Sequence, residues 1–283
     1  MNSSGSAAGL GLLSAASWGG SDFVGGLGAR RAPALLVVAA GHAVSLLALL
    51  AFCLAARLPF PGHHDLLFAA LGGFEGALAL ALFYRALAMG AMGLTAALTG
   101  LLTALIPVLF SLFSDGLPTR LVAAGLVLGL AAIWLIALAP NPEGKRVATP
   151  PVALIYGSVA GVGFGVQLIL FKFAADGNAM WVMTSARAAG VAAMLLVLIV
   201  VPPKAPWRGF WLLGILAGSF DTIGNLLYIE TTRIGRLDVA ATVCSLYPAG
   251  TILLAAVVLR EWPAPRQWAG MALALAAVVL LSL

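Results

Sequence analysis

Long apolar stretches separated by short polar ones dominate the chain. A transmembrane helix needs roughly 20 apolar residues to cross a bilayer core. Ten windows of about that length occur, at residues 7–28, 33–56, 65–89, 92–113, 118–139, 150–173, 178–201, 206–231, 237–259 and 263–283. The pattern predicts an all-α integral membrane protein with ten transmembrane helices. Short connections between the windows leave no room for a soluble domain.

Composition agrees with this pattern. Of the 283 residues, 62% are hydrophobic and 9% are charged, and the mean hydropathy is +1.08, which lies outside the range of soluble globular proteins. The net charge is +5, but the fifteen Lys and Arg residues are scattered at the ends of the predicted helices, as interfacial anchors are. Without a basic patch, we expect no nucleic-acid partner.

Few residues suit metal or cofactor chemistry. Cys53 and Cys244 lie in predicted spans without a Cys-x-x-Cys partner, so we interpret them as small apolar packing residues. The His63-His64-Asp65 cluster favours a solvated loop, because adjacent helical residues cannot both face one metal ion. We therefore expect no metal and no cofactor.

The two halves of the chain resemble each other at a shift of about 145 residues. At that shift, "GGFEGALALALFYRA" (72–86) aligns with "GSFDTIGNLLYIETT" (218–232), and Glu75 aligns with Asp221. Because each copy has an odd number of helices, the second copy must enter the membrane in the opposite orientation. The predicted organisation is a first five-helix repeat at 1–139, a linker at 140–149 and an inverted second repeat at 150–283.

Several segments resemble a known family. They are "SAASWGGSDF", "GGFEGALAL", "GSFDTIGNLLY" and "RLDVAATVCSLYPAGTILLAAVVLREW". Together they resemble the drug/metabolite transporter superfamily of the EamA type, and within it the ten-helix amino-acid exporters. The first half departs from the family pattern, because Leu101 and Leu102 stand where the second half has Tyr247-Pro248.

The resemblance implies a fold, a location and an activity. It implies a transporter of the bacterial-type cytoplasmic (inner) membrane with ten helices and both termini in the cytoplasm. The Lys and Arg count favours both termini outside instead. The family resemblance also implies a central cavity and export by alternating access. Spans three, four, eight and nine would line most of this cavity, and spans one and six would line the rest. We expect a monomer whose partners are small molecules and the bilayer.

The strongest candidate site lies in the eighth span. Asp221, Asn225 and Tyr228 follow a helical stripe of i, i+4 and i+7, whereas Glu230 points away, toward an ion pair with Arg233. A charged side chain at the bilayer centre costs about 2.5–3.5 kcal/mol and marks a functional site by default. The alternative is a structural role, with Asp221 capped by hydroxyl groups or protonated.

Glu75 is the matching carboxyl in the third span. Its helical neighbours Ala79 and Leu82 are apolar, which favours the protonated carboxyl. Such a group could couple transport to protons, or it could be a neutral acid bonded to a neighbouring helix. Because the rest of the polar stripe is missing here, we expect the eighth span to make more substrate contacts than the third.

Further candidates come from four other spans. Aromatic residues could stack on a substrate or gate the cavity, or they could simply pack, and hydroxyl groups could bind solute or bond back to their own helix. Pro248 frees a backbone carbonyl within the ninth span, as in the broken helices of transporters. These candidates are Trp18, Asp22, Thr99, Phe164, Gln167, Ser245, Tyr247 and Pro248. Arg187 is a buried cation that could pair with a carboxylate of the protein or the ligand, and His42 favours a packing role.

The function expected from these residues is export of small metabolites, in particular amino acids, including aromatic ones. Asp221 or Glu75 would bind the ammonium group, and Asn225 or a threonine hydroxyl would bind the carboxylate. The alternatives are a drug or sugar-derivative exporter of the same superfamily and, with less support, an integral-membrane transferase. A transferase needs converging nucleophile, base and metal groups that the sequence does not supply. We therefore do not expect an enzyme.

Overall fold

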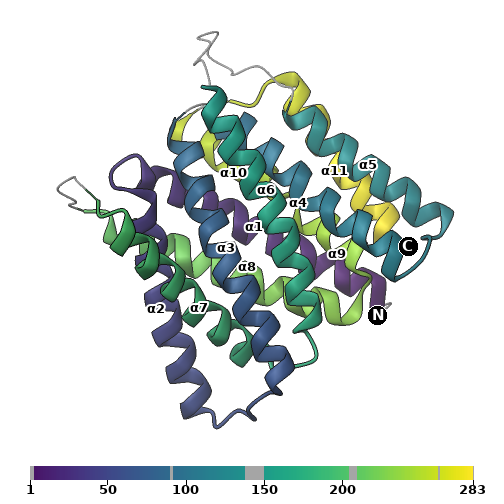
Figure 1. Ribbon diagram of the computed structural model, residues 1–283. Coiled ribbons are helices and arrows are strands. Elements are labelled where there is room, and N and C mark those ends of the chain that lie inside the picture. The colour runs from purple at the N-terminus through teal and green to yellow at the C-terminus, as the bar shows by residue number, and fades with distance from the viewer. Residues whose placement is uncertain (1–2, 90–91, 138–149, 204–208, 261, 283) are drawn as a thin grey trace.

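The computed structural model describes residues 3–89, 92–137, 150–203, 209–260 and 262–282, and within these ranges helices are joined by short connections (Figure 1). The helices are α1 (Ser3–Ala29), α2 (Ala34–Ala55), α3 (His63–Met89), α4 (Met92–Ser114), α5 (Arg120–Ala137), α6 (Pro151–Phe173), α7 (Ala179–Val200), α8 (Trp211–Ile234), α9 (Leu237–Cys244), α10 (Tyr247–Leu254), the π-helical turn η1 (Ala255–Leu259) and α11 (Pro265–Ser282). The predicted linker at 140–149 lies outside the described residues.

Within the described residues, each predicted window overlaps a helix, and the ninth window is broken into two helices. The break follows from Pro248, which has no backbone N–H to continue the helical ladder and sits at the start of α10. Residues Ser245 and Leu246 form the connection between α9 and α10. The expectation of a broken helix at this position is confirmed.

Seven of the described helical segments are long and apolar enough to cross a membrane, and two further helices are shorter and apolar. The seven comprise α2, α3, most of α4, α6, α7, α8 and the α9–α10 segment, and the shorter pair lies in α5 and α11. The 27-residue α1, which is rich in Gly and Ser, is not among the seven. The all-α membrane class is therefore confirmed, while the number of ten spans and the inverted repeat stay predictions.

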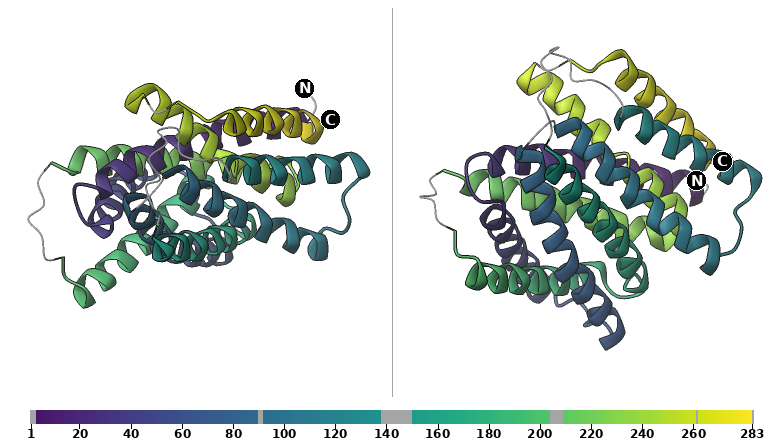
Figure 2. Two further views of the ribbon diagram at one scale, coloured as in Figure 1. Left: turned by 90° about the horizontal axis from the view of Figure 1, so that it is seen from above. Right: turned by 45° about the horizontal axis from the view of Figure 1, so that its top comes forward.

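The helices form one bundle with its two chain ends on the same side (Figures 1 and 2). Helices α5 and α11 pair at one edge, and α2 and α7 pair at the opposite edge. Between them, α1 packs along α8 and α3 packs along α6, and both pairs cross the middle of the molecule. This arrangement surrounds the centre of the bundle with α1, α3, α4, α6, α8 and the α9–α10 segment.

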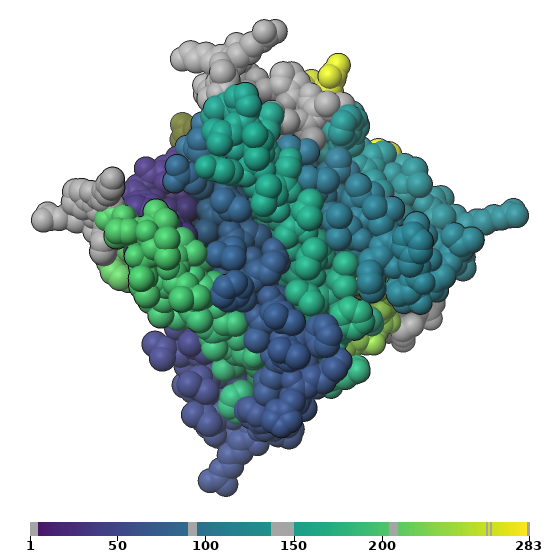
Figure 3. Space-filling view, viewed as in Figure 1, coloured from purple at the N-terminus to yellow at the C-terminus, as the bar shows by residue number. Residues whose placement is uncertain are grey.

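The outer face of the bundle is apolar. Large hydrophobic side chains that no protein atom covers include Ile199 and Val257, which are 78% and 79% exposed. Helices α3 and α6 lie side by side in the middle of the face seen in Figure 3. Apolar exposure of this extent suits a surface in contact with lipid.

Glycines allow two pairs of helices to approach closely. A Cβ atom on Gly73 of α3 would collide with the backbone of Ala186 in α7, and one on Gly218 of α8 would collide with the backbone of Gly41 in α2. Gly218 belongs to one of the GxxxG motifs, which favour such contacts in membrane helices. These contacts place α7 and α2 directly behind the helices that line the centre.

Replacing Gly218 with valine is expected to destabilise the protein by about 1–3 kcal/mol, because the backbone of Gly41 cannot move aside as a side chain can. The measurement is thermal unfolding of the purified protein in detergent. Gly9→Ala is the control, since a Cβ there meets nothing within 4 Å. Equal melting temperatures for Gly218→Val and Gly9→Ala would contradict the packing described.

Candidate functional site

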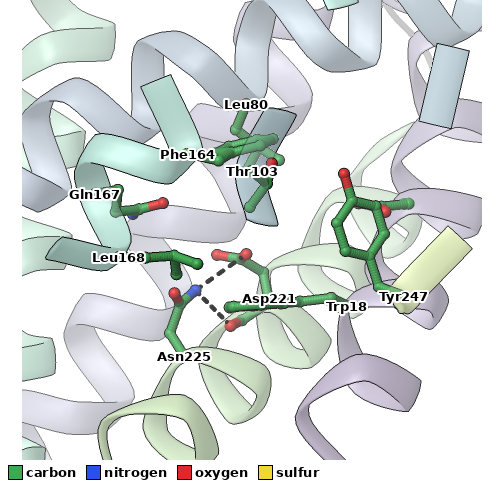
Figure 4. A pocket seen from close by; sticks show the side chains of 10 residues that line it. Trp18, Leu80, Thr103, Phe164, Gln167, Leu168, Asp221, Asn225 and Tyr247 are labelled. Atoms are coloured by element: carbon green, nitrogen blue, oxygen red, sulfur yellow. Dashed lines mark hydrogen bonds between the residues drawn. The ribbon is translucent and has the colours of Figure 1, made fainter. Parts of the chain in front are cut away.

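A small cavity lies at the centre of the bundle, at mid-length of the helices that surround it (Figure 4). Its volume is about 30 Å³. The lining residues are Trp18 and Asp22 of α1, Leu80 of α3, Thr103 of α4, Phe164, Gln167 and Leu168 of α6, Asp221 and Asn225 of α8, and Tyr247 of α10. Seven of the residues predicted from the sequence are brought together here: Trp18, Asp22, Phe164, Gln167, Asp221, Asn225 and Tyr247.

Helical spacing explains how α1 and α8 present two side chains each. Trp18 and Asp22 are one turn apart on α1, as are Asp221 and Asn225 on α8. In Figure 4, Asp221 and Asn225 lie on the opposite side of the cavity from Phe164. Helix α8 contributes two lining residues, whereas α3 contributes Leu80 alone.

Asp221 is neutralised by a buried cation. The guanidinium of Arg187 in α7 donates from Nη2 to Asp221 Oδ2 at 2.6 Å, and its Nη1 lies 2.8 Å from His42 Nε2 in α2. Asn225 Nδ2 donates to Asp221 Oδ1 at 3.1 Å and to the Asp221 carbonyl at 2.8 Å. Both carboxylate oxygens of Asp221 are therefore already occupied, and Arg187 fulfils the expected pairing with a carboxylate of the protein.

Asp22 is the contrasting carboxyl of the cavity. It is only 5% exposed, and its Oδ2 has no hydrogen-bond partner among the described residues. None of the ion pairs found between described residues includes it. Asn225 Oδ1 is a second buried acceptor without a partner in the same part of the chain. The cavity therefore presents two unused oxygen acceptors, one of them a carboxyl group.

Aromatic rings form the remaining walls. Trp18 contacts Tyr247 edge-on at a centroid separation of 6.3 Å and lies against Tyr228 at 5.9 Å. Phe164 packs edge-on against Phe83 at 5.7 Å. Rings in these arrangements offer an apolar surface on which a flat or apolar side chain can pack.

The cavity is narrow in this conformation. A volume of about 30 Å³ admits one or two water molecules and excludes even a small amino acid. On the side of the chain ends, Tyr228 is fully buried and its hydroxyl donates to the Leu168 carbonyl at 2.8 Å. This bond ties α8 to α6 directly below the cavity.

A second, open depression of about 640 Å³ lies beyond Tyr228, at the end of the bundle that carries the chain termini. Lys172 of α6 donates to the Thr232 carbonyl at 2.6 Å, and Arg236 donates to the Gly116 carbonyl at 3.2 Å. A hydrogen bond to Asp238 raises the pKa of Arg236, so it stays a cation. The bond of Arg236 joins the first half of the chain to the second, and that of Lys172 joins α6 to α8 within the second half.

Five of the predicted residues do not line the cavity. Tyr228 forms its floor, as described above. Glu75 lies between α3 and α6, against Gly163, and its buried Oε2 has no partner among the described residues. Thr99 donates to the Gly157 carbonyl of α6 at 2.9 Å. Ser245 occupies the break between α9 and α10, and Pro248 packs against Gly100.

Three lining residues were not predicted: Leu80, Thr103 and Leu168. Thr103 belongs to the hydroxyl series Thr95, Thr99 and Thr103 of the fourth span, which is a signal that could have found it. Its hydroxyl donates back to the Thr99 carbonyl at 2.8 Å, as expected of a threonine within a helix. Leu80 and Leu168 carry no signal, because apolar residues fill every span.

Among the described residues, no group of three or more His, Cys, Asp or Glu side chains could hold a metal ion. Apolar helices surround a small, partly polar site at their mid-length, which is where binding sites lie in membrane transporters.

Comparison with known proteins agrees with this class. Residues 151–283 match the EamA-like transporter family, a family of membrane transporters of the drug/metabolite transporter superfamily rather than of enzymes. A solved structure described only as "Crystal structure of protein" is 19% identical, covers 97% of this chain and 96% of its own, and superposes with a TM-score of 0.73, which shows a shared fold. No curated protein matches the chain.

Replacing Arg187 with methionine is expected to destabilise the protein by about 3–5 kcal/mol, because Asp221 would keep a buried charge without a partner. The double variant Arg187→Met/Asp221→Asn should recover part of that loss. Thermal unfolding in detergent measures both, with Arg85→Met, at an exposed position of α3, as the control. Additive losses in the double variant would mean that the pair does not act as a unit.

Proposed function

We propose that this protein is a secondary transporter that exports amino acids, including aromatic ones, by alternating access across ten transmembrane spans arranged as two inverted repeats. The observation that carries the proposal is the small cavity at mid-bundle. Both halves of the chain line it, aromatic rings form its walls, and it contains a carboxyl oxygen, on Asp22, that has no partner among the described residues.

The packing of the helices supports the inverted repeat. If the halves are exchanged, α1 takes the place of α6, α2 of α7, and α3 of α8. The contact of α1 with α8 then becomes that of α6 with α3, and the contact of α2 with α8 becomes that of α7 with α3; all four occur. The close glycine contacts follow the same symmetry. Gly73 of α3 contacts α7, and Gly218 of α8 contacts α2.

The free acceptors support a substrate with an amino group. The sequence suggested Asp221 or Glu75 as the ammonium ligand, but Asp221 is already paired with Arg187, and Glu75 lies outside the cavity. Asp22 and the amide oxygen of Asn225 are unoccupied and suit an ammonium donor. The Gln167 amide could donate to the carboxylate, and Trp18 could contact an aromatic side chain.

Replacing Asp22 with asparagine is expected to lower flux about 10- to 100-fold, because a charge-assisted hydrogen bond contributes about 1.5–3 kcal/mol. The assay is uptake of a panel of labelled amino acids into proteoliposomes, with amines that lack a carboxylate to represent organic-cation drugs. Asp176→Asn, at an exposed loop carboxylate, is the matched control. Unchanged flux in Asp22→Asn would remove this residue from the site, and faster flux of the amines than of the amino acids would favour a drug exporter.

Replacing Tyr228 with phenylalanine is expected to favour the state that opens toward the chain termini by about 2- to 12-fold, because it removes one α8–α6 hydrogen bond worth about 0.5–1.5 kcal/mol. Reaction of a cysteine at Thr103 with a membrane-impermeant maleimide reports this opening, in a protein whose Cys53 and Cys244 are replaced by alanine. Tyr156→Phe is the control. A labelling rate no faster than that of the control would contradict a sealing role for Tyr228.

A further inference from the structure

The break between α9 and α10 contains two hydroxyl groups that have no partner among the described residues. They belong to Thr242, in the last turn of α9, and to Ser245, the residue that caps this helix. Both residues are completely buried, with an exposed fraction of 0%. A buried polar group without a hydrogen bond costs free energy, so in a native protein it calls for a water molecule or an ion as its partner.

Other hydroxyl groups of the bundle avoid this cost by bonding back to their own helix. Six of them donate to the carbonyl group four residues earlier, as Ser and Thr within helices commonly do. They are those of Thr103, Thr184, Ser219, Thr222, Thr231 and Thr251. Thr242 has the same kind of carbonyl group within α9, on Asp238, but its hydroxyl group does not bond to it. The oxygen of Thr242 is therefore available to a ligand.

The break adds backbone carbonyl groups to these hydroxyl groups. Pro248 has no N–H group, so the Cys244 carbonyl lacks the donor that an unbroken helix would supply. The N–H group of Ala249 bonds to the Leu246 carbonyl, three residues back, rather than to the Ser245 carbonyl. Within one turn of chain, the break thus gathers several oxygen acceptors that regular helical bonding would have used.

Neighbouring helices enclose the break. A Cβ atom on Gly100 of α4 would lie 3.2 Å from the Ser245 carbonyl oxygen, and one on Gly129 of α5 would lie 2.6 Å from the methyl group of Thr242. Helix α1 contacts both α9 and α10 from another side. The oxygen atoms of the break therefore lie inside the bundle rather than on its lipid-facing surface.

Neutral oxygen atoms in this position suit a monovalent cation. The C-terminal end of α9 adds the partial negative charge of the helix dipole. A divalent ion such as Ca²⁺ usually needs carboxylate ligands, and the carboxylate of α9, Asp238, is bonded to Arg236 at 2.9 Å at the start of that helix. In transporters with broken helices, unwound carbonyl groups and the C-terminal ends of half-helices coordinate Na⁺.

We infer that a sodium ion binds at the break between α9 and α10, on the hydroxyl groups of Thr242 and Ser245 and on the carbonyl groups that the break frees. This site goes beyond the transport function proposed above and does not depend on which solute is moved. Its ligands are neutral oxygen atoms, which differ from the His, Cys, Asp and Glu clusters considered above. Hydroxyl and carbonyl groups occur throughout the chain, so no sequence pattern predicts the site.

Thermal unfolding of the purified protein in detergent tests the site, in NaCl, KCl or choline chloride at one ionic strength. A ligand that binds only the folded state stabilises it, so the melting temperature should be at least about 2 °C higher in NaCl than in choline chloride. Equal melting temperatures in the three salts would overturn the inference. An equal rise in KCl would overturn the assignment to Na⁺.

Thr242→Val and Ser245→Ala identify the ligands. Each removes a hydroxyl group without a protein partner, so neither should lower the melting temperature in choline chloride, whereas both should lose most of the rise in NaCl. Thr231→Val is the control, because the hydroxyl group of Thr231 already bonds to the Leu227 carbonyl, and it should keep the full rise. Equilibrium dialysis with radiolabelled sodium should show the same loss in the two variants. A full response to Na⁺ in both variants would contradict the site.

The central cavity is the other place where a cation could bind, because Asp22 has a carboxyl oxygen without a partner among the described residues. Asp22→Asn should keep the response to Na⁺. If Asp22→Asn abolishes that response while Thr242→Val and Ser245→Ala keep it, the ion lies in the cavity and the inference is wrong. These measurements need no transported solute, so the sodium site and the proposed amino-acid export can each fail without the other.

Discussion

The ion pair between Arg187 and Asp221 is the interaction on which the centre of this protein depends. It joins α7 to α8, and through His42 it reaches α2, so three helices share one buried charge network. A buried pair of this kind contributes less to stability than to geometry, since the desolvation of both charges offsets much of their attraction. Here it holds Asp221 and Asn225 at the cavity wall. It also occupies the carboxylate of Asp221, the acidic residue of the polar stripe in the eighth span.

Close helix packing is the second requirement, because the ion pair needs α2, α7 and α8 to approach one another. Gly41 and Gly218 bring α2 and α8 together, while Gly73 lets α3 settle on α7. Lipid offers no hydrophobic driving force for association between helices, so close backbone contact and interhelical hydrogen bonds must supply it. Hydroxyl groups contribute in the same way, as when Thr99 bonds to α6 and Ser14 bonds to the Gly224 carbonyl of α8.

The cavity combines rigid and movable parts. The break between α9 and α10 places Tyr247 at the start of a new helix, where its ring meets Trp18. Tyr228 joins α8 to α6 with a single hydrogen bond, and Lys172 and Arg236 donate to carbonyl groups nearer the chain ends. Each such bond contributes little, and water can replace it once the helices separate. Contacts of this kind suit the alternating access proposed above.

The membrane class, the positions of the helical segments, the break at Pro248 and most of the residues that meet in the cavity follow from the sequence alone. Apolar length and helical periodicity are local properties, so they can be read without a structure. Which carboxyl groups are compensated, in contrast, emerges only from the packing of the helices. Arg187 lies 34 residues before Asp221 and 145 after His42, and nothing local pairs them. Because a buried charge is governed by its spatial neighbours, the packing of α7 behind α8 pairs Asp221 with Arg187, whereas Asp22 has no ion-pair partner among the described residues.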